Sequence, residues 1–214
     1  MRVVVAYVFP NLKPNTYQPM ARRFVETYLA HPPGEFSHEI LVLVNGPSLT
    51  RQQKELFMPL PVEFLNHDNS GRDLGAYLRA AKTIECDLLI CLGAPLHFWK
   101  GGWLDRIVDV YVAHGPGLYG CWGFKQPYVH LRTTAFWLPP ELLASYPHRI
   151  DDYHRYEFER SRQRSLAAWT IENGLPVSVV GWQSVNYHPE FDSLPPQEFL
   201  MLDQHCDPGG PPCR

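Results

Sequence analysis

His67-Asp68-Asn69-Ser70-Gly71-Arg72-Asp73 is a polar segment with one glycine, and it lies between the apolar run 62–65 and a helical pattern over residues 74–83. In α/β sheets, the loops that leave the carboxyl ends of strands hold ligands, because the strand fixes the backbone while the loop side chains stay free to converge. This segment, the 67–73 loop, therefore indicates an α/β fold and forms the first candidate site.

Strand-like apolar runs alternate with helical patterns along the chain, as expected for a mostly parallel central sheet flanked by helices. We expect strands at residues 2–9, 39–44, 62–65, 87–92, 118–124, 131–138 and 177–180. We expect helices at residues 20–29, from a cap at Thr50 to about residue 57, and at 74–83, 103–113 and 155–173, the last closed by Gly174. Residues 10–18 are expected to form a loop after the first strand.

The composition predicts one folded domain, because 214 residues with 45% hydrophobic and 13% aromatic content suffice for a single buried core. We place this domain at residues 1–187. From His188 onward the chain is rich in proline and glycine. Residues 188–214 are therefore expected to form a loosely wrapped or disordered tail or flap.

Charge and cysteine content argue against several classes of protein. The formal net charge is -3 and the longest basic run is Arg22-Arg23, so no nucleic-acid partner is expected. No apolar segment approaches the ~20 residues that span a bilayer, and residues 1–8 fit a core strand better than a signal peptide. The five cysteines are an odd number, which favours a reduced, cytoplasmic protein. A small-molecule or glycan partner is expected.

Two segments carry a resemblance to a known family. Asn69-Ser70-Gly71-Arg72-Asp73-Leu74 resembles the Asn-x-Gly-Arg-Asp motif of rhamnan-synthesis-type glycosyltransferases. Tyr156-Glu157-Phe158-Glu159, with Leu166 and Glu172-Asn173-Gly174-Leu175, is similar to the acidic helix of that family. The order of elements over about residues 1–182 is similar to the nucleotide-sugar half of GT-A glycosyltransferases. The resemblance implies a single GT-A-like (Rossmann-like) domain that transfers a sugar from a nucleotide-activated donor to a hydroxyl acceptor, in glycan or surface polysaccharide synthesis.

The resemblance also implies roles for individual residues. The donor-binding candidates are Asn45, Asp68, Asn69, Gly71, Arg72 and Asp73. The proton of the acceptor hydroxyl would pass to a carboxylate of the acidic helix. Glu157 and Glu159 lie two residues apart and point in different directions on a helix, so at most one of them serves, and Glu159 is preferred. Inversion of the sugar is expected over retention.

Each of these residues also fits a purely structural role. Asp68, Asn69 and Gly71 fit a turn that caps the following helix. Arg72 and Asp73 fit a solvated pair on a first helical turn, where a carboxylate is favoured by the helix dipole. A charged, solvent-facing helix accounts equally well for the two glutamates.

The end of the fourth strand departs from the resembled family. Most GT-A enzymes carry Asp-x-Asp there, and its carboxylates hold Mg²⁺ or Mn²⁺ against the donor diphosphate. Here the strand ends Cys91-Leu92-Gly93-Ala94-Pro95-Leu96-His97, without a carboxylate. Three outcomes stay open: another group stabilises the leaving diphosphate, unusual ligands hold the metal, or catalysis is lost. Cationic substitutes are Arg72, Lys100 and His97, and candidate metal ligands are Asp73 and His205.

Aromatic rings beside glycines are candidates for stacking on an acceptor sugar. Trp103 follows Gly101-Gly102, and Trp122 lies within Gly120-Cys121-Trp122-Gly123. Sugar faces stack well on exposed rings, although such residues also fit the core.

Two other functions remain possible from the sequence. A non-catalytic module that binds a nucleotide sugar or glycan is favoured by the missing Asp-x-Asp. A sugar-phosphate nucleotidyltransferase is disfavoured, because residues 7–11 lack the glycine-rich, lysine-bearing loop expected for that reaction. The sequence predicts neither the sugar, the base nor the oligomeric state.

Overall fold

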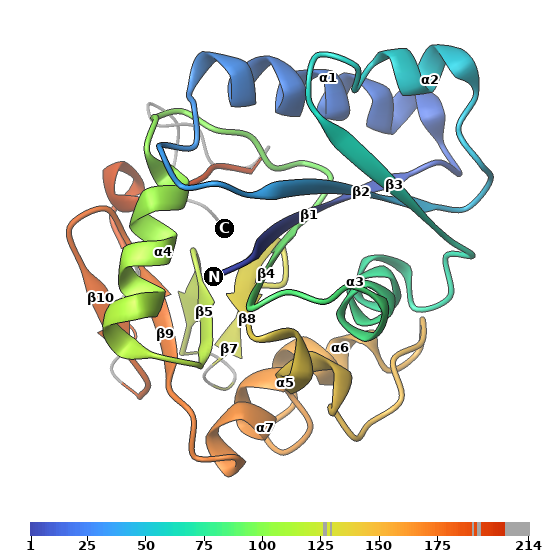
Figure 1. Cartoon of the computed structure of the whole chain (residues 1–214). Coiled ribbons are helices and arrows are strands. Elements are labelled where there is room, and N and C mark those ends of the chain that lie inside the picture. The colour runs from blue at the N-terminus through green and yellow to red at the C-terminus, as the bar shows by residue number, and fades with distance from the viewer. Residues whose placement is uncertain (126–127, 129, 190, 192–193, 204–214) are drawn as a thin grey trace.

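The structure is a computed structural model of the whole chain, and it describes residues 1–125, 128, 130–189, 191 and 194–203. Within these residues, eight strands form one sheet in the order β10-β9-β5-β8-β4-β1-β2-β3 (Figure 1). The predicted α/β class, a single domain with a mostly parallel central sheet flanked by helices, is confirmed.

One half of the sheet is fully parallel. It consists of β1 (Val3–Pro10), β2 (Glu39–Asn45), β3 (Val62–His67) and β4 (Leu88–Leu92), with β1 pairing with both β2 and β4. The apolar runs predicted all four strands, and β1, β2 and β4 are almost entirely buried. Because the strands run in the same direction, their carboxyl ends meet at one edge of the sheet.

The other half contains reversed strands. Here β8 (Ala135–Leu138) runs antiparallel to both β4 and β5 (Leu118–Gly120), while β9 (Val177–Val180) is parallel to β5 and antiparallel to β10 (Val185–Tyr187). The predicted strands 118–124 and 131–138 are each divided: β6 (Gly123–Phe124) and β7 (His130–Leu131) leave the main sheet and pair with one another.

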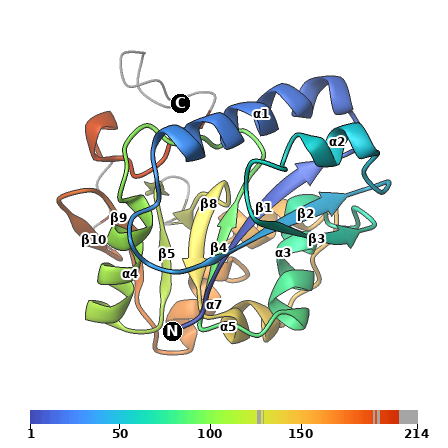
Figure 2. The ribbon, with the colours of Figure 1, turned by 45° about the horizontal axis from the view of Figure 1, so that its top comes forward.

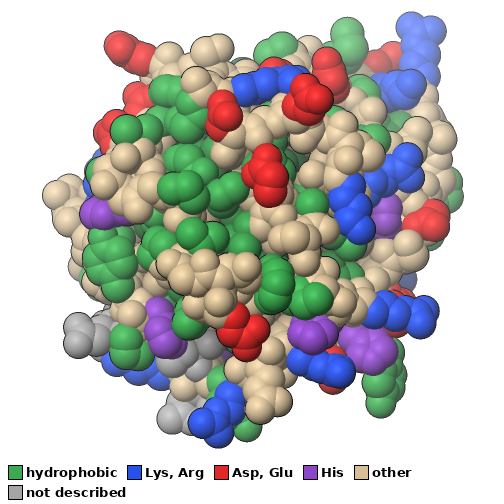
Figure 3. Space-filling model, turned by 60° about the horizontal axis from the view of Figure 1, so that its bottom comes forward, with side chains coloured by type: hydrophobic (Ala, Val, Ile, Leu, Met, Phe, Trp, Pro, Cys, Tyr) green, Lys and Arg blue, Asp and Glu red, His purple; other side chains and the backbone are tan. Residues whose placement is uncertain are grey.

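Helices cover both faces of the sheet. They are α1 (Pro14–Ala30), α2 (Arg51–Glu55), α3 (Arg72–Thr83), α4 (Trp103–His114), α5 (Pro140–Ala144), α6 (Arg155–Arg160) and α7 (Leu166–Glu172), with a 3₁₀ turn at Pro196–Glu198. Figures 1 and 2 show α1 and α2 on one side of β1 and β2, and α3 on the other. On the face that carries α5, α6 and α7, acidic and basic side chains are interspersed (Figure 3).

The predicted loop 10–18 is wrong in its second half, because α1 begins at Pro14. Proline suits the first turn of a helix, where its missing N–H has no partner to lose. The helix continues through Pro19. The predicted cap at Thr50 is confirmed: its side chain accepts a hydrogen bond from the Gln53 amide while the Gln53 side chain accepts from the Thr50 amide.

The predicted helix 155–173 is wrong as one helix. The structure has α6 and α7, separated by an extended residue at Ser161. The Ser161 hydroxyl accepts from the Arg164 amide, and the Ser165 hydroxyl accepts from the Ala168 amide at 3.1 Å. These side-chain bonds satisfy amides that a continuous helix would have bonded to its own backbone. Gly174 ends α7 with a left-handed φ of 72°, as predicted.

Part of the expected tail packs against the domain. Residues 199–203 are buried, and backbone bridges join Leu202 to His97 and Phe199 to Gly181. The division at residue 187 therefore stays a prediction. None of the helices in the described part of the chain combines the length and the apolar character that crossing a bilayer requires.

Candidate functional site

A pocket of about 580 Å³ lies at the carboxyl edge of the parallel strands. Its lining comes from the ends of β1 and β2, from the 67–73 loop and from the residues after β4, with further side chains from the start of β8 and of α6. The lining residues are Val8, Pro10, Leu12, Lys13, Tyr17, Asn45, Asn69, Arg72, Asp73, Gly93, Ala94, Pro95, Thr134, Asp152 and Arg155. Four of the predicted donor-binding residues, Asn45, Asn69, Arg72 and Asp73, thus lie in one pocket.

A buried histidine fixes the polar ends of two neighbouring strands. His67 Nδ1 lies 2.9 Å from Asn45 Oδ1 and 3.1 Å from the backbone nitrogen of Asn69. Burial lowers the pKa of His67 below its usual value, against the opposing effect of the Asp68 carboxylate. The imidazole is therefore neutral at pH 7, which suits a positioning role in a polar cluster.

The backbone of the 67–73 loop is left-handed at three residues. The φ angles are 72° at Asn69, 67° at Gly71 and 54° at Arg72. Left-handed conformations cost a non-glycine residue roughly 1–2 kcal/mol, and asparagine tolerates them better than arginine does. A Cβ at Gly71 would lie 2.9 Å from the Ile150 carbonyl oxygen, so this glycine also permits a close backbone approach.

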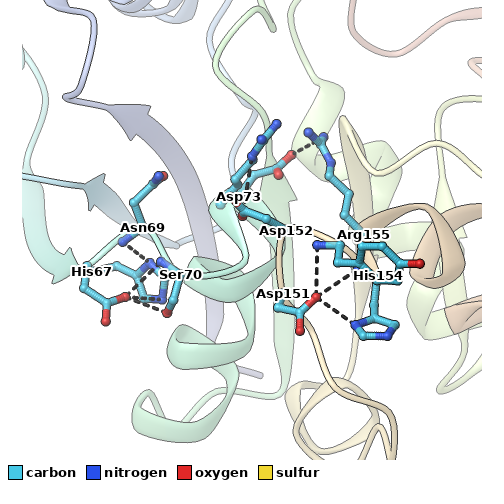
Figure 4. Close-up of polar contacts among 11 residues, drawn as sticks. His67, Asn69, Ser70, Asp73, Asp151, Asp152, His154 and Arg155 are labelled. Atoms are coloured by element: carbon cyan, nitrogen blue, oxygen red, sulfur yellow. Dashed lines mark hydrogen bonds and ion pairs between the residues drawn. The ribbon is translucent and has the colours of Figure 1, made fainter.

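Two ion pairs cross the pocket between the start of α3 and the start of α6. Arg155 Nη2 lies 3.4 Å from Asp73 Oδ2, and Arg72 Nε lies 3.5 Å from Asp152 Oδ1. Figure 4 shows Asp73 and Arg155 pointing toward one another. The segment that carries Asp152 and Arg155 is held by Asp151, whose Oδ1 accepts from the backbone amides of Tyr153 and His154.

Asp73 occupies an unusual electrostatic position for an aspartate. Its side chain is 23% exposed, and burial raises its pKa above the usual value although Arg155 and two backbone amides oppose the shift. Asp152 is more accessible, with a side chain that is 59% exposed. The pocket thus presents one shielded and one accessible carboxylate, each beside an arginine.

The loop after β1 adds a third cation. Lys13 lines the pocket from the residue before α1. The backbone of Asn11 donates to the Asn45 carbonyl at 2.7 Å, and the Asn11 side-chain oxygen accepts from Gln53 of α2 at 2.5 Å. These bonds tie the loop to the end of β2.

Two predicted donor-binding residues stay outside the lining. Asp68 accepts from the Ser70 hydroxyl at 2.6 Å and from the Ser70 amide at 2.9 Å, which lowers the pKa of Asp68. Gly71 contributes its backbone turn against Ile150. Both residues stabilise the conformation of the 67–73 loop without lining the pocket, so contact of either with a donor remains a prediction.

The two predicted catalytic glutamates lie on α6 but do not line the pocket. Glu159 Oε2 accepts from the Thr133 hydroxyl at 2.8 Å, and Glu159 Oε1 accepts from Arg160 at 2.8 Å. Burial opposes ionisation of Glu159, yet these bonds outweigh it and lower its pKa. Glu157 pairs with Arg164 at 3.0 Å near the surface. The structure therefore gives both carboxylates structural partners, and a catalytic role for either remains a prediction.

The acceptor and phosphate candidates after β4 also lie elsewhere. His97 is buried, with its backbone bridged to Leu202. The Lys100 ammonium lies 4.1 Å from the centre of the Trp182 ring. Neither residue lines the pocket, whose contribution from the segment after β4 consists of Gly93, Ala94 and Pro95.

The two tryptophans predicted to stack on an acceptor sugar are both buried in this structure. Trp103 has no exposed surface and stacks on Phe98, with the ring centres 4.4 Å apart. Trp122 is buried beside Phe199. Both rings belong to the core and offer no free face to a sugar. The candidate metal ligand His205 lies outside the described residues.

Sequence reasoning missed three charged residues of the pocket: Lys13, Asp152 and Arg155. The loop that contains Lys13 had been identified only as a segment. Asp152 and Arg155 lie just before and at the start of α6, far along the chain from the strand ends, and no local sequence pattern indicates that they reach the pocket.

Comparison with known proteins shows similarity in fold. No protein-family model and no curated protein matches the sequence. A protein from Bacillus anthracis named as a glucose-1-phosphate thymidylyltransferase, solved with a sucrose, superposes with a TM-score of 0.55 at 10% identity, over 82% of this chain and 85% of its own. The chain has a GT-A/nucleotidyltransferase-like fold.

Two further structures are glycosyltransferases. A mannosyltransferase from Pyrobaculum calidifontis, in complex with GDP-Man and Mn²⁺, gives a TM-score of 0.53 at 13% identity, over 73% of this chain and 51% of its own. A mouse xyloside xylosyltransferase without ligand gives 0.51 at 10% identity, over 81% of this chain and 82% of its own. This chain spans about half the length of the mannosyltransferase.

The pocket does not match the ligand set of a divalent metal. Mg²⁺ and Mn²⁺ prefer several oxygen ligands, chiefly carboxylates. In the ranges that the structure describes, no group of three or more His, Cys, Asp or Glu side chains could hold a metal ion. The carboxylates that line the pocket each face an arginine. The candidate Asp73 is thus engaged by Arg155, and residues 93–95 after β4 bring no carboxylate.

Proposed function

We propose that this protein is a glycosyltransferase that binds a nucleotide-sugar donor in the 580 Å³ pocket and transfers the sugar to a hydroxyl group of a glycan. The supporting observation is the place of the pocket, at the carboxyl ends of β1 to β4 in a fold that glycosyltransferases share. Its volume falls within the ~300–1,000 Å³ typical of small-molecule sites.

The pocket can perform the two tasks that glycosyl transfer requires. Cationic side chains beside a diphosphate stabilise the leaving group, and a carboxylate accepts the proton of the attacking hydroxyl. Asp73 and Asp152 are the carboxylates of the pocket lining, so we propose one of them as proton acceptor in preference to Glu159 or Glu157. The same proposal includes four further points: membership of the rhamnan-synthesis-type family, inversion of the sugar, a role in surface polysaccharide synthesis, and a reducing, cytoplasmic location.

A binding and turnover assay on the full chain tests the proposal. We expect UDP-, GDP- or dTDP-sugars at millimolar concentration to raise the Tm, because a ligand that binds the native state stabilises it. Asn69→Gly is the sharpest variant, since glycine keeps the left-handed backbone of φ 72° and removes only the side chain from the pocket. Wild-type protein that is not stabilised by any nucleotide sugar would contradict the proposal.

The similarity to a nucleotidyltransferase supports a second candidate function. The Bacillus anthracis structure superposes on 82% of this chain. A lysine, Lys13, lies in the loop after β1. That loop nevertheless contains no glycine between Tyr7 and Lys13. Release of pyrophosphate from a nucleoside triphosphate and a sugar 1-phosphate would favour this function; release of a nucleoside diphosphate from a nucleotide sugar would favour the glycosyltransferase.

A non-catalytic binding module is separated by the same assay. It would be stabilised by a nucleotide sugar and would neither transfer nor hydrolyse the sugar with a broad panel of acceptors.

A further inference from the structure

The inference rests on the proposed function and concerns how the donor is held. We propose that Lys13, Arg72 and Arg155 bind the diphosphate of the donor directly, without a divalent metal. The ligand class is a nucleoside diphosphate, free or attached to a sugar.

The first argument is the convergence of charge. Lys13 precedes α1, Arg72 begins α3 and Arg155 begins α6, yet all three line one pocket. Arginine presents several N–H donors in a planar fork that matches phosphate oxygens. Side chains from three distant segments reach this pocket only in the folded protein, so the fold itself assembles the cationic site.

The second argument is the state of the two arginines before a ligand arrives. Each faces one carboxylate across the pocket, at 3.4 Å for Arg155 and Asp73 and at 3.5 Å for Arg72 and Asp152. These distances are longer than the 2.7–2.9 Å of a strong charge-assisted hydrogen bond. The carboxylates therefore orient the guanidinium groups without saturating them, and two arginines with one lysine exceed two carboxylates in charge.

The third argument is the backbone at Arg72. Its φ of 54° is a conformation that glycine or asparagine adopts more easily. Strain of this kind at a pocket is characteristic of positions whose side chain is needed there. The side chain in question is a guanidinium that lines the pocket, and its positive charge favours an anionic ligand.

The chemistry balances without a metal. The bond between the anomeric carbon and the diphosphate oxygen breaks, and its electron pair stays on that oxygen, where the guanidinium and ammonium groups stabilise the charge. The acceptor oxygen forms the new bond to the anomeric carbon, and its proton passes to a pocket carboxylate.

Calorimetric titration with UDP and GDP, in excess EDTA and separately with Mn²⁺, tests the inference on the full chain. We expect at least one diphosphate to bind in EDTA, and UMP or GMP to bind more weakly. Arg72→Asn keeps the left-handed backbone and removes the charge. The double variant Arg155→Gln with Asp73→Asn removes the cation without leaving its carboxylate unpaired. Each should weaken diphosphate binding roughly 10- to 100-fold.

Lys82→Gln on α3 and Arg162→Gln between α6 and α7 are matched controls, since each removes one exposed positive charge outside the pocket lining. The Tm of every variant is measured alongside, so that only folded proteins are compared. Binding that requires Mn²⁺, or pocket variants that bind as the controls do, would overturn the inference while leaving the proposed function standing. Failure of every nucleotide to bind under both conditions would reject the proposed function and, with it, the inference.

Discussion

Asp73 and Arg155 join the start of α3 to the start of α6, with 3.4 Å between Asp73 Oδ2 and Arg155 Nη2. The pair spans the pocket, so the same contact that links two helices also sets the charge of the site. Burial nevertheless raises the pKa of Asp73, because the arginine only partly compensates for lost hydration.

The raised pKa predicts how stability depends on pH at this position. The folded state holds the Asp73 proton to a higher pH than the unfolded state does, so the carboxylate lowers stability as pH rises through the raised pKa. Asp73→Asn should therefore increase the Tm at pH 7.5, and the increase should shrink toward pH 4. Thermal melts from pH 4 to pH 8 measure it.

Asp152→Asn is the control for this experiment. Its side chain is 59% exposed and pairs with Arg72, so its Tm should change little at any pH. An Asp73→Asn protein whose Tm falls further below wild type as pH rises would show that the ion pair with Arg155 outweighs burial.

Gly71 and Gly174 provide a second prediction, because both are left-handed glycines in different surroundings. Their φ angles are 67° and 72°, but a Cβ at Gly71 would lie 2.9 Å from the Ile150 carbonyl oxygen, whereas nothing lies within 4 Å at Gly174. Gly174→Ala should cost about 1–2 kcal/mol from backbone strain alone. Gly71→Ala should cost more, and it should also weaken nucleotide binding by displacing Arg72.

Chemical denaturation of the two alanine variants measures the difference. Equal losses of unfolding free energy would mean that Ile150 moves aside without cost and that the close approach at Gly71 is unimportant.

The parallel half of the fold could be predicted because each of its strands is a local apolar run bounded by turn residues. The polar loop after β3 led to Asn69, Arg72 and Asp73 for the same reason, since adjacency to a strand end is visible in the sequence.

The rest of the site depends on contacts between distant segments. Lys13 and Arg155 have ordinary local surroundings, and only the packing of α1 and α6 against the strand ends brings them to the pocket. The break between α6 and α7 could not be predicted, because serine is compatible with a helical pattern. The Ser161 and Ser165 hydroxyls accept hydrogen bonds from backbone amides, and these bonds mark the end of one helix and the beginning of the next. Trp103 beside two glycines fitted either a sugar contact or the core, and the structure places its ring in the core.

The last prediction concerns Glu159, which the sequence assigns to catalysis and whose contacts are structural. Its carboxylate accepts from the Thr133 hydroxyl at 2.8 Å and from Arg160 at 2.8 Å. Because these bonds lower the pKa of Glu159, their contribution is present above the ordinary glutamate pKa and is lost as pH falls through the lowered value. Glu159→Gln should cost roughly 1.5–3 kcal/mol of unfolding free energy at pH 7, a loss that shrinks in acid. Thr133→Val should cost a similar amount, and the double variant less than the sum, because both substitutions act on the same contact between residues 133 and 159. Glu157→Gln, which breaks only a surface pair with Arg164, should change stability by less than about 1 kcal/mol.

Transfer assays on the folded variants complete the test of Glu159. Retained turnover in Glu159→Gln agrees with a structural glutamate, whereas a fall in turnover of about 10²–10⁴-fold at unchanged stability would restore Glu159 as the base.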